Sequence, residues 1–542
     1  MVQSIAMRDL PSTSALFVDL WAGAEGYRGL VPRHFLQPGA FREQANLVSQ
    51  GSYRREELAA LLRDQNEKLG AGSPALQSIA RLSDPRSLVV IGGQQAGLFG
   101  GPLYTVHKAL TILRTARRME KELGVPVVPI FWIASEDSDL AEIDHAWAVD
   151  GDGELRQFRL PSSSPDKVPV STIRLGDSIG ALLDGLGQAI PGGGYKDEVM
   201  AALRASYTPG RTYPQAFGAW MAWLFREEGL VLVDPSDDRL KRMAQGLFER
   251  EIREKSPVSA AVIEQTARLK AAGYEPQIEL REGYLTLFHQ DPARDAIAVR
   301  ENGFELKSTG KLLRAEELCA TLQRHPEKFT PNAVLRPLFQ DTVFPVLAVV
   351  LGPSEIVYYS QLTLAYERLG VRMPLLLPRA SVTLVEEKAE RHRARLEVGY
   401  LDVIRHGERI IDDILRREVP ASLTQGITAG REQDDLGWQR IIGEIDRLDP
   451  TLHRTAELAA RRAARQFDFM EKKIAQAARK KNEILRAQVR RLVNGIAPRG
   501  GLQERTICAV PFLALHGKEG LAAAAEAIDP FAPEHRVLVV PA

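Results

Sequence analysis

A strand, a loop, a helix and a second strand follow one another between residues 87 and 135, and this order constrains the fold more than any other feature. The apolar run SLVVIGG predicts a short buried strand that ends at two glycines. Residues 104–123 carry apolar side chains at helical spacing, and VPVVPIFWIAS predicts a second buried strand. Such a βαβ unit requires a parallel sheet and places its loop at the carboxyl end of the first strand.

The same pattern returns later in the chain, after an interruption. In residues 331–386, FPVLAVVLGPSEIVYYSQL predicts a strand, a Gly-Pro turn and a helix, and VRMPLLLPRAS predicts a further strand. Residues 151–330 instead contain polar segments with glycine and proline around short elements. Within them GLVLVDPSDD predicts a buried strand, and YLTLFHQ and AIAVRENGFEL predict a small antiparallel sheet. We therefore expect an α/β core in two parts, residues 1–150 and 331–386, separated by an inserted α+β region.

Helical patterns dominate residues 387–500. Asp449-Pro450 marks a break, and about 45 residues without glycine or proline follow, far more than a typical globular helix contains. Spacings of three and four suit a coiled-coil seam formed by Phe467, Met470, Ile474, Ala477, Lys481 and Ile484. Residues 461–491 contain eleven Lys/Arg against three Asp/Glu. This excess is consistent with a surface for phosphate or nucleic acid, or with a solvated helical face, which we favour.

Residues 501–542 contain two short strand candidates, TICAVPFLALHG and HRVLVVPA, which could close a sheet begun earlier in the chain. They would bring the C-terminal segment back to the core.

The composition narrows the functional classes. The chain has 542 residues, 44% apolar and 26% charged, with 70 Lys+Arg against 70 Asp+Glu, so no charge bias indicates nucleic acid as a partner. Cys319 and Cys508 lie far apart, which excludes a disulfide framework and zinc spacings and favours a reducing cytoplasm. The N-terminal residues do not resemble a signal peptide. No uncharged apolar stretch approaches the roughly 20 residues of a membrane helix.

The loop GGQQAGLFGGP is the first candidate site. Its glycines let the backbone approach a ligand, and free N–H groups at the following helix attract anions. The two glutamines offer amide donors and acceptors, and His107 and Lys108 can reach over a bound anion from the start of the helix. The alternative is a tight turn whose glycines serve packing. The candidates are Gly93, Gln94, Gln95, Gly97, Gly101, Tyr104, Thr105, His107 and Lys108.

Acidic residues follow the second strand, in SEDSDLAEIDH. Glu136, Asp137 and Asp139 could act as a base, bind an amine or hold Mg²⁺. The structural alternative is an acidic N-cap, in which Ser135 or Asp137 begins the next helix.

Polar residues also accompany the later strands. Gly352-Pro353 is a second glycine turn before a helix, where Ser354 could be the N-cap and Glu355 would lie in the first turn. Two such turns in one α/β domain predict two loops that face one crevice. The candidates here are Arg336, Gln340, Asp341, Gly352, Glu355, Tyr358, Tyr359, Arg379 and Ser381.

Taken together, these segments resemble the bacillithiol synthase family, the cysteine-adding enzymes of bacillithiol biosynthesis. The matching stretches are GGQQAGLFGGPLYTVHK, VPVVPIFWIASEDSDLAEIDH, PNAVLRPLFQDTVFPVLAVVLGPSEIVYY, RMPLLLPRAS and LQERTICAVPFLALHG. They cover nearly the full length in order. The chain departs from the family at Gly93, where threonine is expected, and at FGGP, where Thr-Gly-Pro is expected.

The resemblance implies a Rossmann-like core similar to class I nucleotidyltransferases, with inserted connecting-peptide subdomains and a long coiled coil that forms a homodimer. It implies a ligase that joins the carboxyl of L-cysteine to the amine of glucosaminyl-malate, in the final step of bacillithiol biosynthesis. By class I analogy ATP, with Mg²⁺, would activate cysteine. GPLYTVHK, with His107, lies where a HIGH-type motif would be, and PRAS stands in for the missing KMSKS.

On this basis the expected catalytic residues are His107, Glu136, Asp137 and Asp139, and the other candidates would bind substrate. Two alternatives stay open. One is a different ATP-dependent ligase or nucleotidyltransferase on the same core. The other is a non-catalytic protein that binds through its coiled coil.

Overall fold

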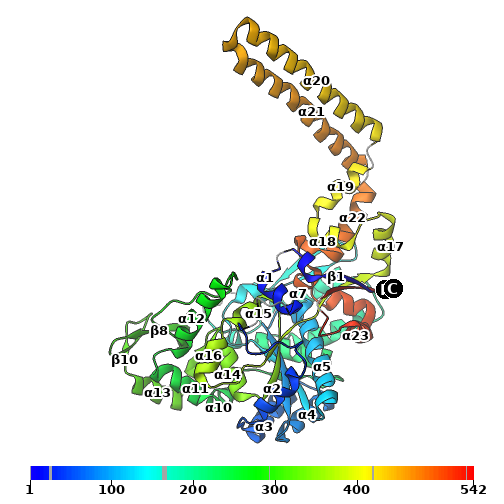
Figure 1. Cartoon of the computed structure of the whole chain (residues 1–542). Coiled ribbons are helices and arrows are strands. Elements are labelled where there is room, and N and C mark those ends of the chain that lie inside the picture. The colour runs from blue at the N-terminus through cyan, green and yellow to red at the C-terminus, as the bar shows by residue number, and fades with distance from the viewer. Residues whose placement is uncertain are drawn as a thin grey trace. The chain divides into compact units, whose positions relative to one another are not determined.

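The computed structural model describes residues 2–11, 13–23, 27, 29–161, 168–291, 293–417, 420–481, 483–532 and 534–541. The chain forms two compact units. Unit 1 comprises Met1–Gly151, Leu155–Val385 and Gln503–Ala542, and unit 2 comprises Asp152–Glu154 and Glu386–Leu502. Figure 1 shows both units coloured along the chain.

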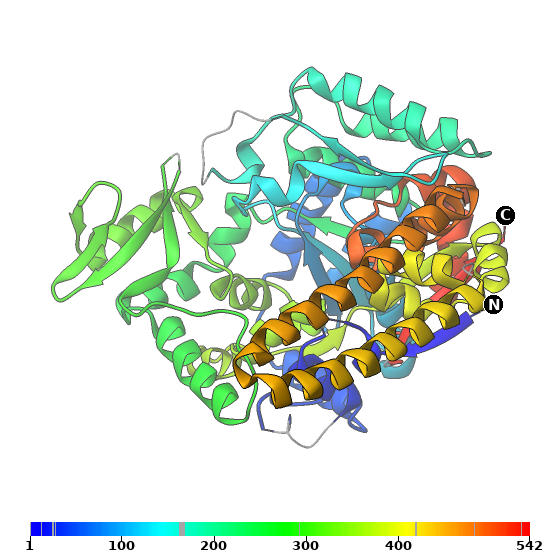
Figure 2. The same ribbon diagram turned by 90° about the horizontal axis from the view of Figure 1, so that it is seen from above.

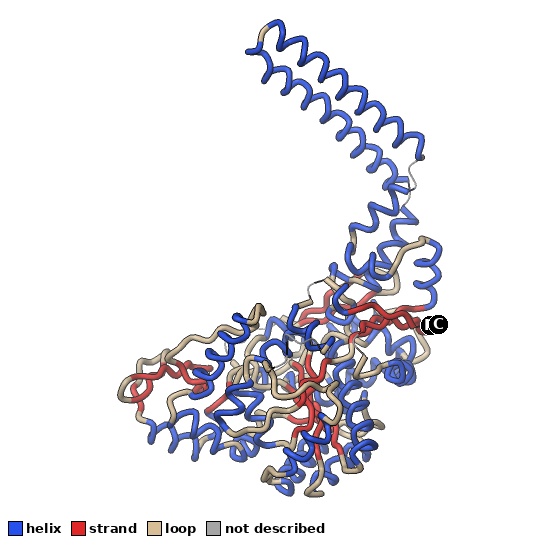
Figure 3. Tube along the Cα trace, in the orientation of Figure 1, coloured by secondary structure: helices blue, strands red, loops and turns tan. Residues whose placement is uncertain are grey.

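Unit 1 is built on a parallel sheet of five strands. In spatial order the strands are β13 (Leu375–Pro378), β12 (Val346–Leu351), β2 (Leu88–Gln94), β3 (Val127–Ile133) and β6 (Val231–Val233). The chain runs outward from β2 through β3 to β6, and then crosses back to β12 on the other side of β2. Such a reversal is the topological switch point at which α/β sheets bind ligands. The predicted α/β fold with a parallel sheet is confirmed, and Figure 3 shows these strands in red among helices in blue.

Burial explains why these segments form strands. Every residue of β3 and β12 is buried, as expected for a parallel sheet covered on both faces. The helix α5 (Tyr104–Leu123) has the predicted bounds and ends at Gly124, which adopts a left-handed conformation with φ of 69°. The carboxyl end of β2 is so crowded that a Cβ at Gly93 would lie 2.6 Å from the backbone oxygen of Trp132. Only glycine fits there without displacing β3.

The region between the two parts of the core supplies a second sheet and several helices. The sheet is antiparallel, in the order β10 (Leu312–Leu313), β9 (Gly303–Leu306), β8 (Arg294–Arg300), β7 (Tyr284–Gln290) and β11 (Phe329–Pro331). It confirms the predicted small antiparallel sheet. The main helices are α7 (Ser178–Ala189), α8 (Lys196–Ser206), α9 (Tyr213–Leu224), α10 (Asp238–Met243), α11 (Gln245–Arg253), α12 (Pro257–Ala271) and α13 (Ala315–Arg324). One strand of this region, β6, belongs to the central sheet.

The two ends of the described chain lie together in a third sheet, as Figure 2 shows. Its order is β1 (Val2–Ala6), β15 (Glu534–Val540) and β14 (Ser381–Glu386), so the predicted strand HRVLVV does close a sheet. The other predicted strand, TICAVPFLALHG, is wrong, because most of it lies in the helix α23 (Val510–Ala527). A continuous apolar run does not distinguish a buried strand from a buried helix, and Pro511 suits the first turn of a helix.

Unit 2 is helical. Its elements are α17 (Glu387–Arg395), α18 (Tyr400–His406), α19 (Arg409–Arg417), α20 (Ala421–Leu448), α21 (His453–Lys481) and α22 (Glu483–Ile496). The helices α20 and α21 run side by side as a hairpin that turns at Pro450–Leu452 (Figure 1).

The predicted seam of this hairpin is only partly enclosed. Phe467 lies against α20, where a Cβ on Gly430 would approach its ring to 3.1 Å, and Arg431 pairs with Asp468 at 2.9 Å. Met470 is about half exposed, at 49%. The side chains of Lys481 and Ile484 lie outside the described part of the chain. No helix among the described residues is long and apolar enough to cross a membrane.

Candidate active site

A cavity of about 900 Å³ lies at the carboxyl ends of the central strands in unit 1. It joins the loop after β2, the acidic segment after β3 and the turn after β12, as the two glycine turns predicted. The predicted residues that line it are Gly93, Gln94, Gln95, Gly97, Gly101, Tyr104, Thr105, Lys108, Glu136, Asp137, Arg336, Gly352, Glu355, Tyr358 and Arg379. Its wall does not include the predicted residues His107, Asp139, Gln340, Asp341, Tyr359 and Ser381.

Lys108 ties the two glycine turns together. Its Nζ donates to the carbonyl of Gly93 at 2.6 Å and to Gln94 Oε1 at 3.0 Å, and pairs with Glu355 Oε2 at 2.5 Å. The same Glu355 oxygen accepts the backbone N–H of Gly352 at 2.6 Å, so Gly352 rather than Ser354 is the N-cap of α15 (Pro353–Ser360). Burial lowers the pKa of Lys108, and Glu355 opposes the shift. Lys108 therefore already has an anionic partner.

The two glutamines connect the β2 loop to the acidic segment. Gln95 Nε2 donates to Glu142 Oε2 at 2.8 Å, and Gln94 donates to Gln95 Oε1 and to the Tyr104 hydroxyl. Burial raises the pKa of Glu142, and the nearby carboxylates of Asp139 and Asp137 raise it further. The side-chain amides of Gln94 and Gln95 therefore link the β2 loop to the carboxyl group of Glu142 and fix this wall of the cavity.

The three predicted carboxylates are held differently. Asp139 accepts the N–H of Glu142 at 3.3 Å as the N-cap of α6 (Leu140–Ile143). The acidic N-cap considered above is therefore present, but Asp139 forms it rather than Ser135 or Asp137. Glu136 is buried beside Lys241 at 2.7 Å, and burial raises its pKa while Lys241 opposes the shift. Asp137 Oδ1 accepts two backbone N–H groups, at 2.7 and 3.2 Å, but its Oδ2 has no hydrogen-bond partner among the described residues. Asp137 thus offers the cavity an unengaged carboxylate oxygen.

Arg336 is fixed by residues of α14 (Leu335–Val343) and α15. Its guanidinium donates to the Tyr358 hydroxyl at 3.0 Å, and at 3.4 Å to the Tyr359 hydroxyl and to Gln340 Oε1. Gln340 in turn donates to Asp341 at 2.9 Å, and burial raises the pKa of Asp341 to about 7. Gln340, Asp341 and Tyr359 therefore lie behind the cavity and orient the arginine that lines it.

Glu504, from the C-terminal segment, organises the opposite wall. It accepts from Arg379 Nη2 at 2.8 Å, from Ser381 Oγ at 3.0 Å, from the Val382 N–H at 2.8 Å and from His107 Nδ1 at 3.0 Å. Burial would raise the pKa of Glu504, but Arg379 and His107 hold it well below its usual range. His107 is 1% exposed, and burial lowers its pKa. His107 and Ser381 are therefore placed to position Arg379, which lies over the Tyr104 ring.

Comparison with known proteins identifies the family. Residues 2–380 match the model described as Bacillithiol biosynthesis BshC, N-terminal Rossmann-like domain, and residues 382–540 match that of the C-terminal coiled-coil domain. The chain belongs to the BshC family. The Rossmann-like core and the coiled-coil region inferred from the resemblance are thereby confirmed.

Curated relatives of this BshC chain align over most of their length. A protein of Koribacter versatilis is 34% identical over 99% of both chains. One of Salinibacter ruber is 33% identical over 92% of this chain and 91% of its own, and one of Bacillus velezensis is 31% identical over 84% and 85%. Each is named "Putative cysteine ligase BshC".

Several residues of the BshC cavity were not predicted. Arg294 and Phe288 come from the antiparallel sheet, Asn332 follows β11, and Arg505 follows Glu504. No pattern in a single sequence marks Arg294, because it lies in a region with no recognisable motif. Glu504 and Arg505 lie in LQERTICAV, a stretch that matches the family but in which no site residue was predicted.

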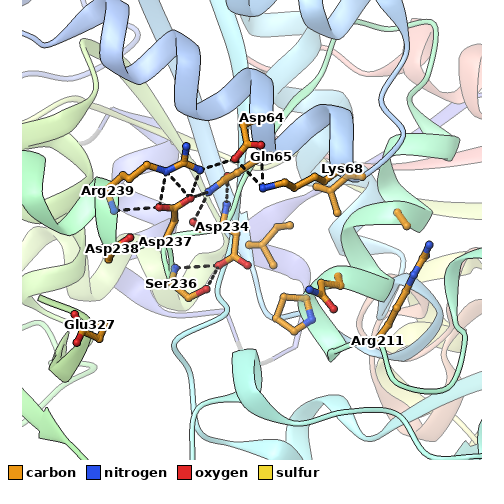
Figure 4. A pocket seen from close by; sticks show the side chains of 15 residues that line it. Asp64, Gln65, Lys68, Arg211, Asp234, Ser236, Asp237, Asp238, Arg239 and Glu327 are labelled. Atoms are coloured by element: carbon orange, nitrogen blue, oxygen red, sulfur yellow. Dashed lines mark hydrogen bonds and ion pairs between the residues drawn. The ribbon is translucent and has the colours of Figure 1, made fainter. Parts of the chain in front are cut away.

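A second cavity of the BshC chain, of about 860 Å³, lies on α3 (Arg55–Lys68) and at the end of β6 (Figure 4). Its acidic groups are paired: Asp64 with Lys68 at 2.9 Å, and Asp237 with Arg239 at 2.7 Å. Asp234 accepts from Ser236 Oγ at 2.7 Å. Because these carboxylates already have partners, they are less available to bind or activate a ligand than Asp137 in the first cavity.

Proposed function

We propose that this protein is a ligase that joins the carboxyl of L-cysteine to the amine of glucosaminyl-malate, in the final step of bacillithiol biosynthesis. The observation that carries the proposal is a single cavity lined both by Asp137, with its unengaged carboxylate oxygen, and by Arg294, Arg336, Arg379 and Arg505. A substrate with both an amine and carboxylates is complementary to such a site. The names of the relatives agree with this activity.

Amide formation requires a group in the cavity that accepts the proton of the attacking amine. The amine nitrogen forms a bond to the cysteine carboxyl carbon, and the bond from that carbon to its activating group breaks, with the electron pair leaving on that group. The proton released by the amine passes to Asp137 Oδ2 as general base. Glu136 is less suited to this role, because it is buried against Lys241.

ATP would supply the leaving group that activates the cysteine carboxyl. The residues at the start of α5 fit a phosphate group. Thr105 Oγ1 is buried and has no hydrogen-bond partner in the described structure, and Gly101 leaves room beside it, since a Cβ there would lie 3.3 Å from that oxygen. N–H groups at a helix start attract anions, and Arg379 and Arg505 line the same cavity.

Mg²⁺ would accompany the nucleotide phosphates, which usually supply part of its coordination. Within the described residues no group of three or more His, Cys, Asp or Glu is arranged to hold a metal ion. We therefore assign no protein ligand set to Mg²⁺.

We also propose that the protein is cytoplasmic and forms a homodimer through unit 2, as the family resemblance implies. The hairpin exposes the apolar side chains of Leu436, Ile441 and Phe469, at 55%, 47% and 52%. Sedimentation should give a dimer for the protein and a monomer for a Leu436→Glu/Phe469→Glu variant. A wild-type monomer at micromolar concentration would rule the dimer out.

The activity is tested with purified protein, L-cysteine, glucosaminyl-malate and ATP, with the thiol product and the nucleotide measured by mass spectrometry. Asp137→Asn should lower kcat by about 10²- to 10⁴-fold, the usual contribution of a general base. Asp184→Asn is the control, because Asp184 lies on the surface of α7 and pairs with Arg204.

A deletion strain provides the independent test. It should lack bacillithiol and accumulate glucosaminyl-malate, and the wild-type gene but not the Asp137→Asn variant should restore the thiol. Normal bacillithiol in the deletion strain would refute the function. Accumulation of a different amine would favour another ATP-dependent ligase.

A further inference from the structure

One wall of the cavity carries a guanidinium, that of Arg294, which has no anionic partner among the residues that the structure describes. Arg294, at the start of β8, donates from Nε to Thr330 Oγ1 at 3.1 Å, and its guanidinium lies over the Phe288 ring at 5.1 Å. Its two terminal nitrogens form no hydrogen bond or ion pair with any residue that the structure describes. These contacts fix the plane of the guanidinium and leave the edge formed by its two terminal nitrogens for a ligand in the cavity that Arg294 lines.

The surroundings of Arg294 make an anionic ligand favourable. Burial lowers the pKa of Arg294, and the charges of Glu136 and Asp137 oppose the shift without forming an ion pair with it. A cation removed from water without a partner is unfavourable, and a ligand carboxylate in the cavity would remove that cost. Guanidinium and carboxylate also match in geometry, through two parallel N–H···O bonds.

Asn332 supplies a second donor beside this arginine. Its Oδ1 accepts the N–H groups of Val334 and Leu335, both at 3.1 Å, and so caps the start of α14. This fixes the amide, and Nδ2 has no hydrogen-bond partner in the described ranges. Thr330, which holds Arg294, lies two residues earlier on the same extended segment, and residues at this spacing share a face. Asn332 also lines the cavity.

We propose that Arg294 and Asn332 form a carboxylate anchor that holds the malyl group of the amine substrate. The inference rests on the proposed function. Asn332 Oδ1 is already engaged, so the groups left for a ligand, the terminal nitrogens of Arg294 and Asn332 Nδ2, are donors, which suit a carboxylate better than a hydroxyl or an amine. Asp137, whose charge acts on Arg294, is the proposed base. In glucosaminyl-malate the malyl group and the amine sit on neighbouring sugar carbons, so an anchored carboxylate brings the amine toward Asp137.

Two variants and one control test the anchor by steady-state kinetics. Arg294→Gln removes the charge, and Asn332→Asp keeps the cap on α14 but replaces the donor with a carboxylate. Loss of a charged hydrogen bond corresponds to about 10- to 100-fold in affinity. Each variant should raise KM for glucosaminyl-malate by this factor and leave KM for cysteine unchanged. Arg300→Gln is the control, since Arg300 lies on the same strand but pairs with Glu305.

The outcomes separate the anchor from the function on which it rests. If KM for cysteine rises instead, the carboxylate belongs to cysteine and the proposal is overturned; unchanged KM values for both substrates also overturn it. If the wild-type protein makes no amide, the proposed function fails, and calorimetric binding of L-malate then decides the anchor. Binding by wild type and by Arg300→Gln that is lost in Arg294→Gln supports it, and equal or absent binding refutes it.

Discussion

His535 should make the stability of this protein depend on pH between 7 and 4.5. The side chain lies on β15 and is 0% exposed, with Nδ1 2.8 Å from Ser381 Oγ and Nε2 2.9 Å from Thr383 Oγ1. Two hydroxyl partners suit a neutral ring, in which one nitrogen donates and the other accepts. Burial lowers the pKa of His535 to about 4; Glu504 opposes this shift, and His107 and Arg379 add to it.

The sign and size of the effect follow from linkage. An unfolded histidine has a pKa of about 6.5, so between pH 6.5 and 4 the unfolded chain binds a proton that the folded His535 does not. The stability from the neutral ring is complete above pH 6.5 and is lost as the pH falls toward 4. Between pH 7 and 4.5 the unfolding free energy should fall by about 2.5 kcal/mol from this residue alone.

Urea titrations of wild type and His535→Gln at pH 7 and pH 4.5 measure this contribution. The variant should lose about 2.5 kcal/mol less than wild type over this range, whatever its stability at pH 7, because an amide does not titrate. His325→Gln, at an exposed histidine, should behave as wild type. The same pH dependence in wild type and His535→Gln would refute the reasoning.

Three further substitutions probe the cavity. Gly93→Ala places a Cβ 2.6 Å from the Trp132 carbonyl and should lower the unfolding free energy by about 1–3 kcal/mol; an unchanged urea midpoint would contradict the crowding. Lys108→Met leaves the Glu355 carboxylate without its cation and should cost about 3 kcal/mol, part of which Glu355→Gln in the same chain should restore. Glu504→Gln leaves a buried guanidinium uncompensated and should cost about 3–5 kcal/mol and at least tenfold in kcat; activity and thermal unfolding equal to wild type would show that it is dispensable.

The local patterns were sufficient to predict the core. Short apolar runs that end at glycine, with a helical segment between them, define a parallel sheet with loops at one edge, and the turns after β2 and β12 do meet at one cavity. The orientation of side chains around α5 was harder to infer. Successive residues of a helix differ by about 100°, so Tyr104, Thr105 and Lys108 line the cavity while His107 points to Glu504.

The partners from distant segments could not be predicted. His107 and Glu504 are 397 residues apart, and no spacing rule in a single sequence relates them. Arg294 reaches the cavity only because β8 belongs to a sheet that packs at the edge of the site. In the sequence Arg294 cannot be distinguished from an ordinary exposed arginine. Only its contacts in the fold show that its terminal nitrogens have no partner in the described structure.

The position of Glu504 also determines when the site can form during synthesis. The ribosome translates β14 first, then the helices of unit 2 from α17 to α22, and only then Glu504 and β15. Until that point the nascent chain holds Arg379 without its carboxylate partner and β14 without its neighbour in the sheet. Domains generally fold in the order in which they emerge. Here the central strands can pair early, but the wall of the cavity that Glu504 organises is completed only after the helices of unit 2 have been made.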